Sequence, residues 1–127
     1  MALILDTNAP SALGDGDEAL EETIREEHDL ALPAVVLGEY LFGIRQSRWR
    51  NRYEGWLRDH MSKFLLLAVG NKTAERYAEI RQELKTAGRP IPSNDLWIAA
   101  LSREHGYPVI TRDVHFAAVR DLRRVGW

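Results

Sequence analysis

The sequence predicts an α/β fold in which one parallel sheet is covered by helices on both faces. Two patterns support this prediction: several apolar runs are too short to be helices, and segments with helical periodicity lie between them. The chain has 127 residues, of which 45% are hydrophobic and 28% are charged. This composition is typical of a globular domain and excludes a disordered chain, so we expect a single domain over residues 1–127.

The N-terminal part is expected to form two strands and two short helices. Ala2–Leu5 is an apolar run that is too short for a helix, and the turn-like Asp-Thr-Asn follows it, which favours a buried strand. Pro10 suits the first turn of a short helix. Asp17 can cap a second helix that runs to about His28, with acidic residues in its first turn. Leu30–Leu32 is then a second strand.

The middle of the chain changes to a helical period. A helix is expected from Ala34, with one apolar stripe formed by Leu37, Tyr40, Leu41 and Ile44. A second helix repeats the pattern with Trp49, Tyr53, Trp56 and Leu57. Phe64–Val69 is apolar throughout, which predicts a strand that is buried on both faces.

The C-terminal part is expected to contain the central helix of the core. A helix that includes Ile80 should end near Gly88, a natural stop, and the prolines that follow keep the chain extended. Ser93 or Asn94 then caps a helix whose interior, Leu96–Leu101, is apolar nearly all round and should be buried. The last elements expected are a strand, a short helix and a final strand, at Pro108–Thr111, Val114–Val119 and Arg124–Trp127.

Four acidic residues fall at positions where such a fold binds ligands. Asp6 follows the first strand, Asp113 follows the strand near residue 110, and Asp95 lies in the first turn of the buried helix. Ligands of open parallel sheets bind outside the carboxyl ends of the strands. Glu39 lies beside an apolar stripe and can border the core. Taken singly, each acid could equally be a turn former or a solvated helix residue.

Taken together, the four acids predict a metal site. Converging carboxylates repel one another, and a divalent cation with a preference for oxygen ligands, Mg²⁺ or Mn²⁺, relieves that repulsion. Cysteine is absent, which excludes thiolate ligands, and the four histidines are scattered. Such a site acidifies water and stabilises charge on a phosphoryl group, so the chemistry expected is phosphodiester hydrolysis.

The net charge of −2 conceals an asymmetry along the chain. Residues 1–29 contain nine acidic residues and one basic residue, whereas residues 30–127 contain ten acidic and sixteen basic residues. A basic body of this kind can attract nucleic acid, although helices that simply differ in surface charge would give the same count. We expect no signal peptide and no membrane span, and hence a cytoplasmic protein.

Four motifs in order resemble those of the PIN-domain ribonucleases, in particular the VapC-type toxins of bacterial toxin–antitoxin pairs. They are Leu5-Asp6-Thr7-Asn8, Gly38–Gly43, Ile91–Ala100 and Val109–Phe116, and they extend over the chain end to end. The resemblance implies a three-layer α/β/α sandwich and a metal-dependent endoribonuclease. It also implies a homodimer and a cognate antitoxin partner. One departure is Ala9-Pro10, which stands where the family usually has bulky aliphatic residues.

The resemblance also implies roles for single residues. Asp6, Glu39, Asp95 and Asp113 match the acids that hold one or two Mg²⁺ or Mn²⁺ ions in the family. Asn8 and Thr111 match positions that support the site by hydrogen bonding.

Contacts with RNA are expected from arginines outside the pocket. Arginine can bind phosphate through two hydrogen bonds, and the candidates are Arg45, Arg48, Arg50, Arg52 and, beside Asp113, Arg112. Arg112 could also neutralise the acids or form an ordinary ion pair. The aromatic residues among the arginines could stack on bases, but their helical spacing favours packing in the core or in a dimer interface.

Two other phosphoryl-processing classes fit less well. A receiver-like domain needs an acidic pair at the first strand and a late lysine, and a haloacid-dehalogenase-type phosphatase needs a second aspartate where Asn8 stands. A catalytically weak PIN-like module that binds RNA or a protein partner remains as the alternative. His115 could transfer protons, but such a histidine more often caps a helix or packs.

Overall fold

The computed structural model describes residues 2–26 and 29–127, and it contains one five-stranded sheet. All neighbouring strands are parallel, in the order β3-β2-β1-β4-β5. The strands are β1 (Ala2–Leu5), β2 (Asp29–Pro33), β3 (Phe64–Leu67), β4 (Val109–Ile110) and β5 (Arg124–Val125). The parallel pairing confirms the sheet that the alternation of strands and helices predicts.

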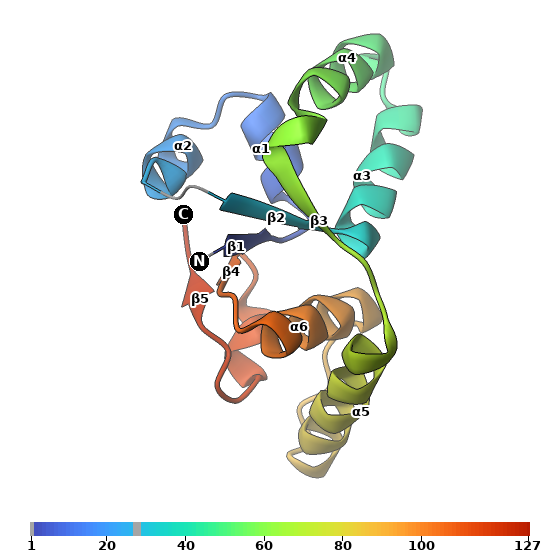
Figure 1. Ribbon diagram of the computed structural model, residues 1–127, viewed down its shortest axis with the longest axis vertical. Coiled ribbons are helices and arrows are strands. Elements are labelled where there is room, and N and C mark those ends of the chain that lie inside the picture. Colours follow the sequence, from blue (N-terminus) through green and yellow to red (C-terminus); the bar gives the residue numbers. More distant parts are fainter. Residues whose placement is uncertain (1, 27–28) are drawn as a thin grey trace.

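Helices cover both faces of this sheet. Above it in Figure 1 lie α1 (Ala9–Gly14), α2 (Glu18–Ile24), α3 (Ala34–Gln46) and α4 (Arg50–His60). Below it lie α5 (Asn71–Thr86) and α6 (Ser93–His105). Two short 3₁₀ helices, at Met61–Lys63 and Val114–Ala118, complete the chain. The three-layer α/β/α sandwich is therefore confirmed.

The core forms around β1 and α6. Every residue of β1 is buried, because this strand is central and both of its faces meet helices. In α6, Ile98 and Leu101 are completely buried, as the apolar character of this helix predicts. The helix stops at Gly106, whose φ of 73° is left-handed and favours glycine.

The prediction that Phe64–Val69 is buried on both faces is wrong. The strand β3 ends at Leu67, and Leu65 and Leu66 are 47% and 51% exposed. The reason is its position at the edge of the sheet, where it pairs only with β2. An apolar run alone does not distinguish an edge strand from a central one.

Two other details also differ from the sequence-based expectation. In α3 the buried residues are Val36, Tyr40 and Ile44, whereas Leu41 is 40% exposed, so the stripe is rotated toward Val36. No side chain caps the start of α6, because Pro92 occupies that position instead of Ser93 or Asn94.

The expected boundaries are met with small shifts. The cap of α2 is confirmed, since the Asp17 side chain accepts a hydrogen bond from the Leu20 N–H at 3.0 Å. The helix α2 ends at Ile24, earlier than the end expected near residue 28, which itself lies outside the described residues. The Ala9-Pro10 departure leaves α1 intact, with both residues buried in its first turn. Among residues 2–26 and 29–127, no helix combines the length and apolar character needed to cross a bilayer.

Candidate metal centre

Three of the predicted acids converge at the carboxyl ends of the central strands. Asp6 directly follows β1, and Asp113 follows β4, which pairs with β1 through Leu5 and Ile110. Asp95 reaches the same place from the first turn of α6. Asp6 is only 3% exposed and Asp95 only 8% exposed, so two of the three carboxylates are buried.

Thr111 links two of these acids. Its hydroxyl donates a hydrogen bond to Asp6 Oδ2 at 2.5 Å and accepts one from the Asp113 backbone N–H at 2.8 Å. The threonine is completely buried. It fixes one oxygen of Asp6 and the start of the Asp113 turn, which is the supporting geometry expected for this position.

His115 completes the cluster, although the sequence reasoning left it outside the site. Its backbone N–H donates to Asp113 Oδ1 at 2.9 Å, so Asp113 caps the 3₁₀ helix that begins at Val114. Its Nδ1 lies 3.0 Å from both Asp95 Oδ2 and Asp113 Oδ1. One signal in the sequence could have indicated this role: His115 lies two residues after Asp113, a predicted metal ligand that follows a strand.

The electrostatics reflect the crowding of negative charge. Burial raises the pKa of the Asp95 carboxyl above its ordinary value, the charges of Asp113 and Asp6 add to the increase, and the His115 hydrogen bond opposes it. The pKa of His115 is raised chiefly by its hydrogen bond to Asp95 and further by Asp113. The cluster therefore favours an added positive charge, here a proton.

The residues present fit a divalent cation. Ligand atoms of Asp95, Asp113 and His115 lie within 4.8 Å of one another. Within the described part of the chain, Asp6 Oδ1 is buried and has no hydrogen-bond partner. A buried carboxylate oxygen without a partner is costly, and oxygen donors are the ligands preferred by Mg²⁺ and Mn²⁺.

Glu39 comes from a different element, α3. It lines a hollow of about 270 Å³ between α1 and α3, together with Thr7 and Asn8, which directly follow Asp6. Asn8 is exposed, and its side chain does not cap α1. The structure thus brings together Asp6, Asp95 and Asp113, and it places Glu39 in the hollow that the residues after Asp6 also line.

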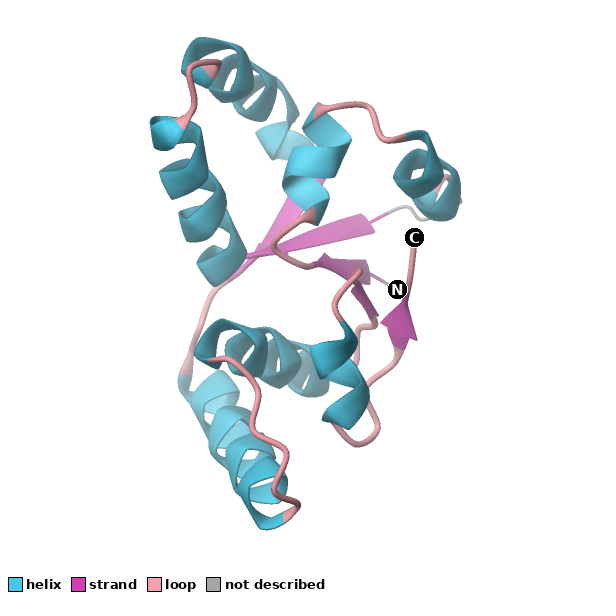
Figure 2. Ribbon diagram, turned by 180° about the vertical axis from the view of Figure 1, so that it is seen from behind, coloured by secondary structure: helices cyan, strands magenta, loops and turns pink. Residues whose placement is uncertain are grey.

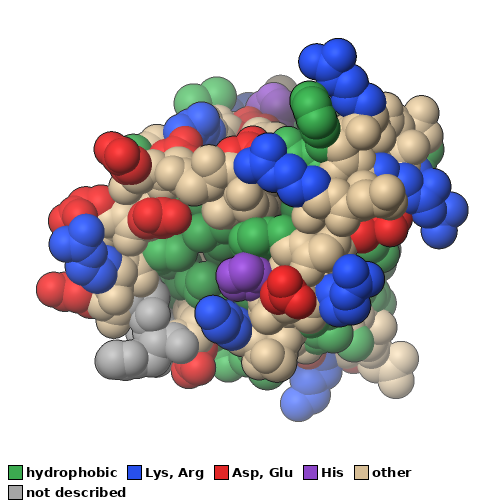
Figure 3. Space-filling view, turned by 90° about the horizontal axis from the view of Figure 1, so that it is seen from above, with side chains coloured by type: hydrophobic (Ala, Val, Ile, Leu, Met, Phe, Trp, Pro, Cys, Tyr) green, Lys and Arg blue, Asp and Glu red, His purple; other side chains and the backbone are tan. Residues whose placement is uncertain are grey.

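The arginines proposed for RNA differ in their surroundings. Arg45, Arg48, Arg50 and Arg52 are all exposed. Of these, Arg50 pairs with Glu54 at 2.6 Å, and Arg48 lies over the Trp49 ring at 5.1 Å from its centroid. Figure 3 shows acidic side chains gathered over α2, with basic ones toward α3 and α4, in keeping with the asymmetry along the sequence.

Arg112 forms an ordinary ion pair, one of the three roles considered for it, the others being phosphate binding and neutralisation of the acids. Its Nη2 lies 2.9 Å from Asp17 Oδ2, and its guanidinium lies 4.6 Å from the centroid of the Trp127 ring.

The aromatic residues of this region mostly pack, as their spacing favours. Trp56 meets Tyr40 edge to face and stacks on His60, and the Tyr53 hydroxyl donates to Asp15. Of Trp49, Tyr53 and Trp56, only Trp49 is exposed.

Comparisons with known proteins agree with this geometry. The sequence matches the model of the PIN domain family over residues 3–122. It is 30% identical over 118 residues to ribonuclease VapC5 of Mycobacterium tuberculosis, a match that covers 91% of this chain and 86% of the relative.

Solved structures show the same fold. A DNA-bound VapBC from Salmonella typhimurium has a TM-score of 0.89 at 22% identity, covering 100% of this chain and 98% of that chain. VapBC-5 from Mycobacterium tuberculosis, described as a toxin–antitoxin system, has a TM-score of 0.75 at 30% identity, covering 98% and 96% of the two chains.

Proposed function

Since this chain belongs to the PIN domain family, we propose that it is the toxin of a toxin–antitoxin pair and a ribonuclease that requires Mg²⁺ or Mn²⁺. The observation that carries the proposal is the convergence of Asp6, Asp95 and Asp113, together with the buried Asp6 Oδ1, which has no hydrogen-bond partner in the described structure. The ribonuclease named VapC5 and the VapBC complexes among its structural relatives support the same activity.

Asp6, Asp95 and Asp113 would hold one or two cations, with Glu39 as a fourth acid from α3. When bound, a divalent cation stabilises charge on a phosphoryl group and lowers the pKa of water. Thr111 orients Asp6 through its hydroxyl, and burial raises the pKa of the Asp95 carboxyl. His115 keeps its Nδ1 within hydrogen-bond reach of two carboxylates.

Binding of the substrate would draw on the exposed arginines of α3, α4 and the segment between them. Arg45, Arg48 and Arg52 present guanidinium groups that can bind phosphates. Arg50 and Arg112 would first have to exchange their partners Glu54 and Asp17 for a phosphate. A cognate antitoxin and a second copy of the chain are the protein partners that we propose.

The decisive experiment measures cleavage of total RNA with Mg²⁺, with Mn²⁺ and with EDTA. We expect cleavage only with a metal ion, and loss of cleavage in Asp6→Asn and Asp95→Asn, which preserve side-chain size. Asp59→Asn is the matched control, because Asp59 is an exposed acid on α4, outside the cluster.

Circular dichroism should show that all three variants are folded. Undiminished metal-dependent cleavage by the two cluster variants would refute the assignment of the site. RNA binding by the wild type without cleavage in any metal would favour the alternative, a catalytically weak binding module.

A further inference from the structure

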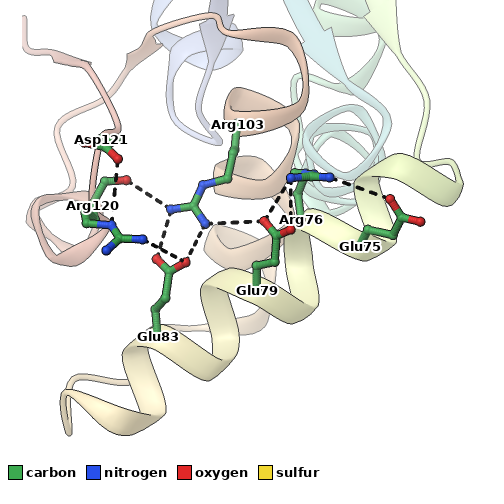
Figure 4. Close-up of polar contacts among 7 residues, drawn as sticks. All are labelled: Glu75, Arg76, Glu79, Glu83, Arg103, Arg120 and Asp121. Carbon is green, nitrogen blue, oxygen red and sulfur yellow. Dashed lines mark hydrogen bonds and ion pairs between the residues drawn. The ribbon is translucent and has the colours of Figure 1, made fainter.

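The helix α5 carries opposite charges on opposite faces. One face bears three glutamates that are all ion-paired, as Figure 4 shows: Arg76 pairs with Glu75 and Glu79, and Arg103 and Arg120 pair with Glu83. The tightest of these pairs, Arg103 with Glu83, has an N to O distance of 2.8 Å. The acids of α5 are thereby paired within the helix, by Arg76, and from α6 and the C-terminal loop, by Arg103 and Arg120.

The other face of α5 presents Tyr77, Arg81 and Lys85 at intervals of four residues. Residues two apart on a helix point about 200° apart, which explains why these side chains face away from Glu79 and Glu83. In the described part of the chain, Arg81 and Lys85 form no ion pair with a carboxylate. This face therefore keeps its positive charge.

These side chains line a groove of about 570 Å³ between α5 and the segment that returns to α6. Figure 2 shows this returning segment running back along α5. The groove has an apolar floor and two cations at its side, and its lining includes Leu84, Pro90, Ile91, Ser93 and Leu96. Ser93 and Leu96 belong to the first turn of α6, so the groove ends where this helix begins.

The cationic side of the groove is held in place from α6. Trp97 stacks on Tyr77 with ring centroids 4.1 Å apart, and Arg81 donates from Nη1 to the Tyr77 hydroxyl at 3.1 Å. Trp97 is two residues beyond Asp95 on the same helix. The position of Arg81 is thus set by packing between α5 and α6.

We propose that this groove binds single-stranded RNA, a proposal that rests on the ribonuclease function proposed above. Arg81 and Lys85 contact backbone phosphates, and the apolar floor accepts a base. Cations that follow the backbone together with apolar contacts to unpaired bases are how proteins bind single strands. A basic groove without paired acids favours a polyanion over a protein segment of neutral charge.

The test measures binding of a fluorescein-labelled single-stranded oligoribonucleotide by anisotropy, in an Asp6→Asn background with Mg²⁺ so that the RNA stays intact. Each phosphate contact to a single strand contributes about 0.7 to the salt slope, so Arg81→Gln with Lys85→Gln should lower the slope by about 1.4. At about 0.1 M salt this corresponds to roughly 25-fold weaker binding, and to about 5-fold for Lys85→Gln alone.

Lys63→Gln is the matched control. Lys63 lies just before β3, at the amino ends of the parallel strands and hence at the opposite edge of the sheet from Asp6. It should keep the affinity and salt slope of the parent. Equal RNA binding by the Arg81/Lys85 variant and its parent would overturn the proposal, as would a variant that changes only the oligomeric state in gel filtration.

The two proposals fail in different ways. Metal-dependent cleavage by the wild-type chain tests the ribonuclease function and does not involve the groove variants. Metal-dependent cleavage by the wild-type chain together with unchanged RNA affinity in the groove variants would refute the groove proposal alone.

Discussion

The hydroxyl of Thr111 offers a precise way to disturb the metal centre without touching an acid. Thr111→Val replaces this hydroxyl with a methyl group of similar size at a completely buried position. The change removes the hydrogen bond to Asp6 Oδ2 and leaves the Asp113 N–H without its acceptor. Asp6, whose Oδ1 already lacks a partner in the described structure, would then have neither oxygen fixed.

The expected loss follows from the two hydrogen bonds. A bond to a charged group contributes about 1.5–3 kcal/mol and a neutral one about 0.5–1.5 kcal/mol, so the free energy of unfolding should fall by about 3 kcal/mol. With a urea dependence of about 1.5 kcal/mol/M, the unfolding midpoint should fall by about 2 M. Loss of a residue that orients a metal ligand typically weakens metal affinity by about 10–100-fold.

Thr73 provides a control with the same local chemistry. It is also completely buried, and its hydroxyl accepts from the Gly70 N–H at 3.0 Å and donates to the Glu104 carboxylate at 2.5 Å. Thr73→Val should therefore lose a similar amount of stability, measured by urea unfolding in EDTA.

Only Thr111→Val should weaken Mn²⁺ binding, measured by calorimetry, and cleavage per folded molecule. If both variants bind Mn²⁺ and cleave RNA equally well, Thr111 does not position Asp6 for the metal.

Three further predictions concern pH, the core and RNA. In EDTA, the folded protein holds the protons of Asp95 and His115 more tightly than the unfolded chain, so their contribution to stability should be lost as pH rises through the raised pKa values. The double variant Asp95→Asn with His115→Gln should flatten this part of the profile of unfolding free energy against pH. An unchanged profile would argue that these two groups do not cause the pH dependence. Phe116→Ala should lower the free energy of unfolding by about 3–5 kcal/mol in urea titrations, because Phe116 is completely buried; a loss below about 1 kcal/mol would show that the site collapses. Arg48→Glu with Arg52→Glu should weaken RNA binding and reduce its salt dependence, and an unchanged salt slope would count against contact with phosphate.

Features that depend on a few neighbouring residues could be predicted from the sequence. Asp17 caps α2 because a side-chain oxygen needs only the N–H three residues on. The burial of α6 follows from apolar residues on nearly all of its faces, and the end of β1 at Asp6 follows from the change in composition there. These local patterns placed three acids at the sheet edge before any contact was known.

Features that depend on distant residues could not be predicted in this way. Exposure of Leu65 and Leu66 follows from the place of β3 at the edge of the sheet, which strand composition does not encode. The pair of Arg112 with Asp17 joins residues 95 positions apart.

The sequence by itself determined the α/β alternation and the acids that follow the strands, because both depend on local periodicity and turn chemistry. Only the tertiary structure decided that His115 joins Asp95 and Asp113. The same holds for α5, where Glu83 is paired by Arg103 of α6 and by Arg120, while the other face of the helix stays cationic. Distances and partners of charges depend on how elements pack, and in this protein packing determines which charges remain available for a ligand.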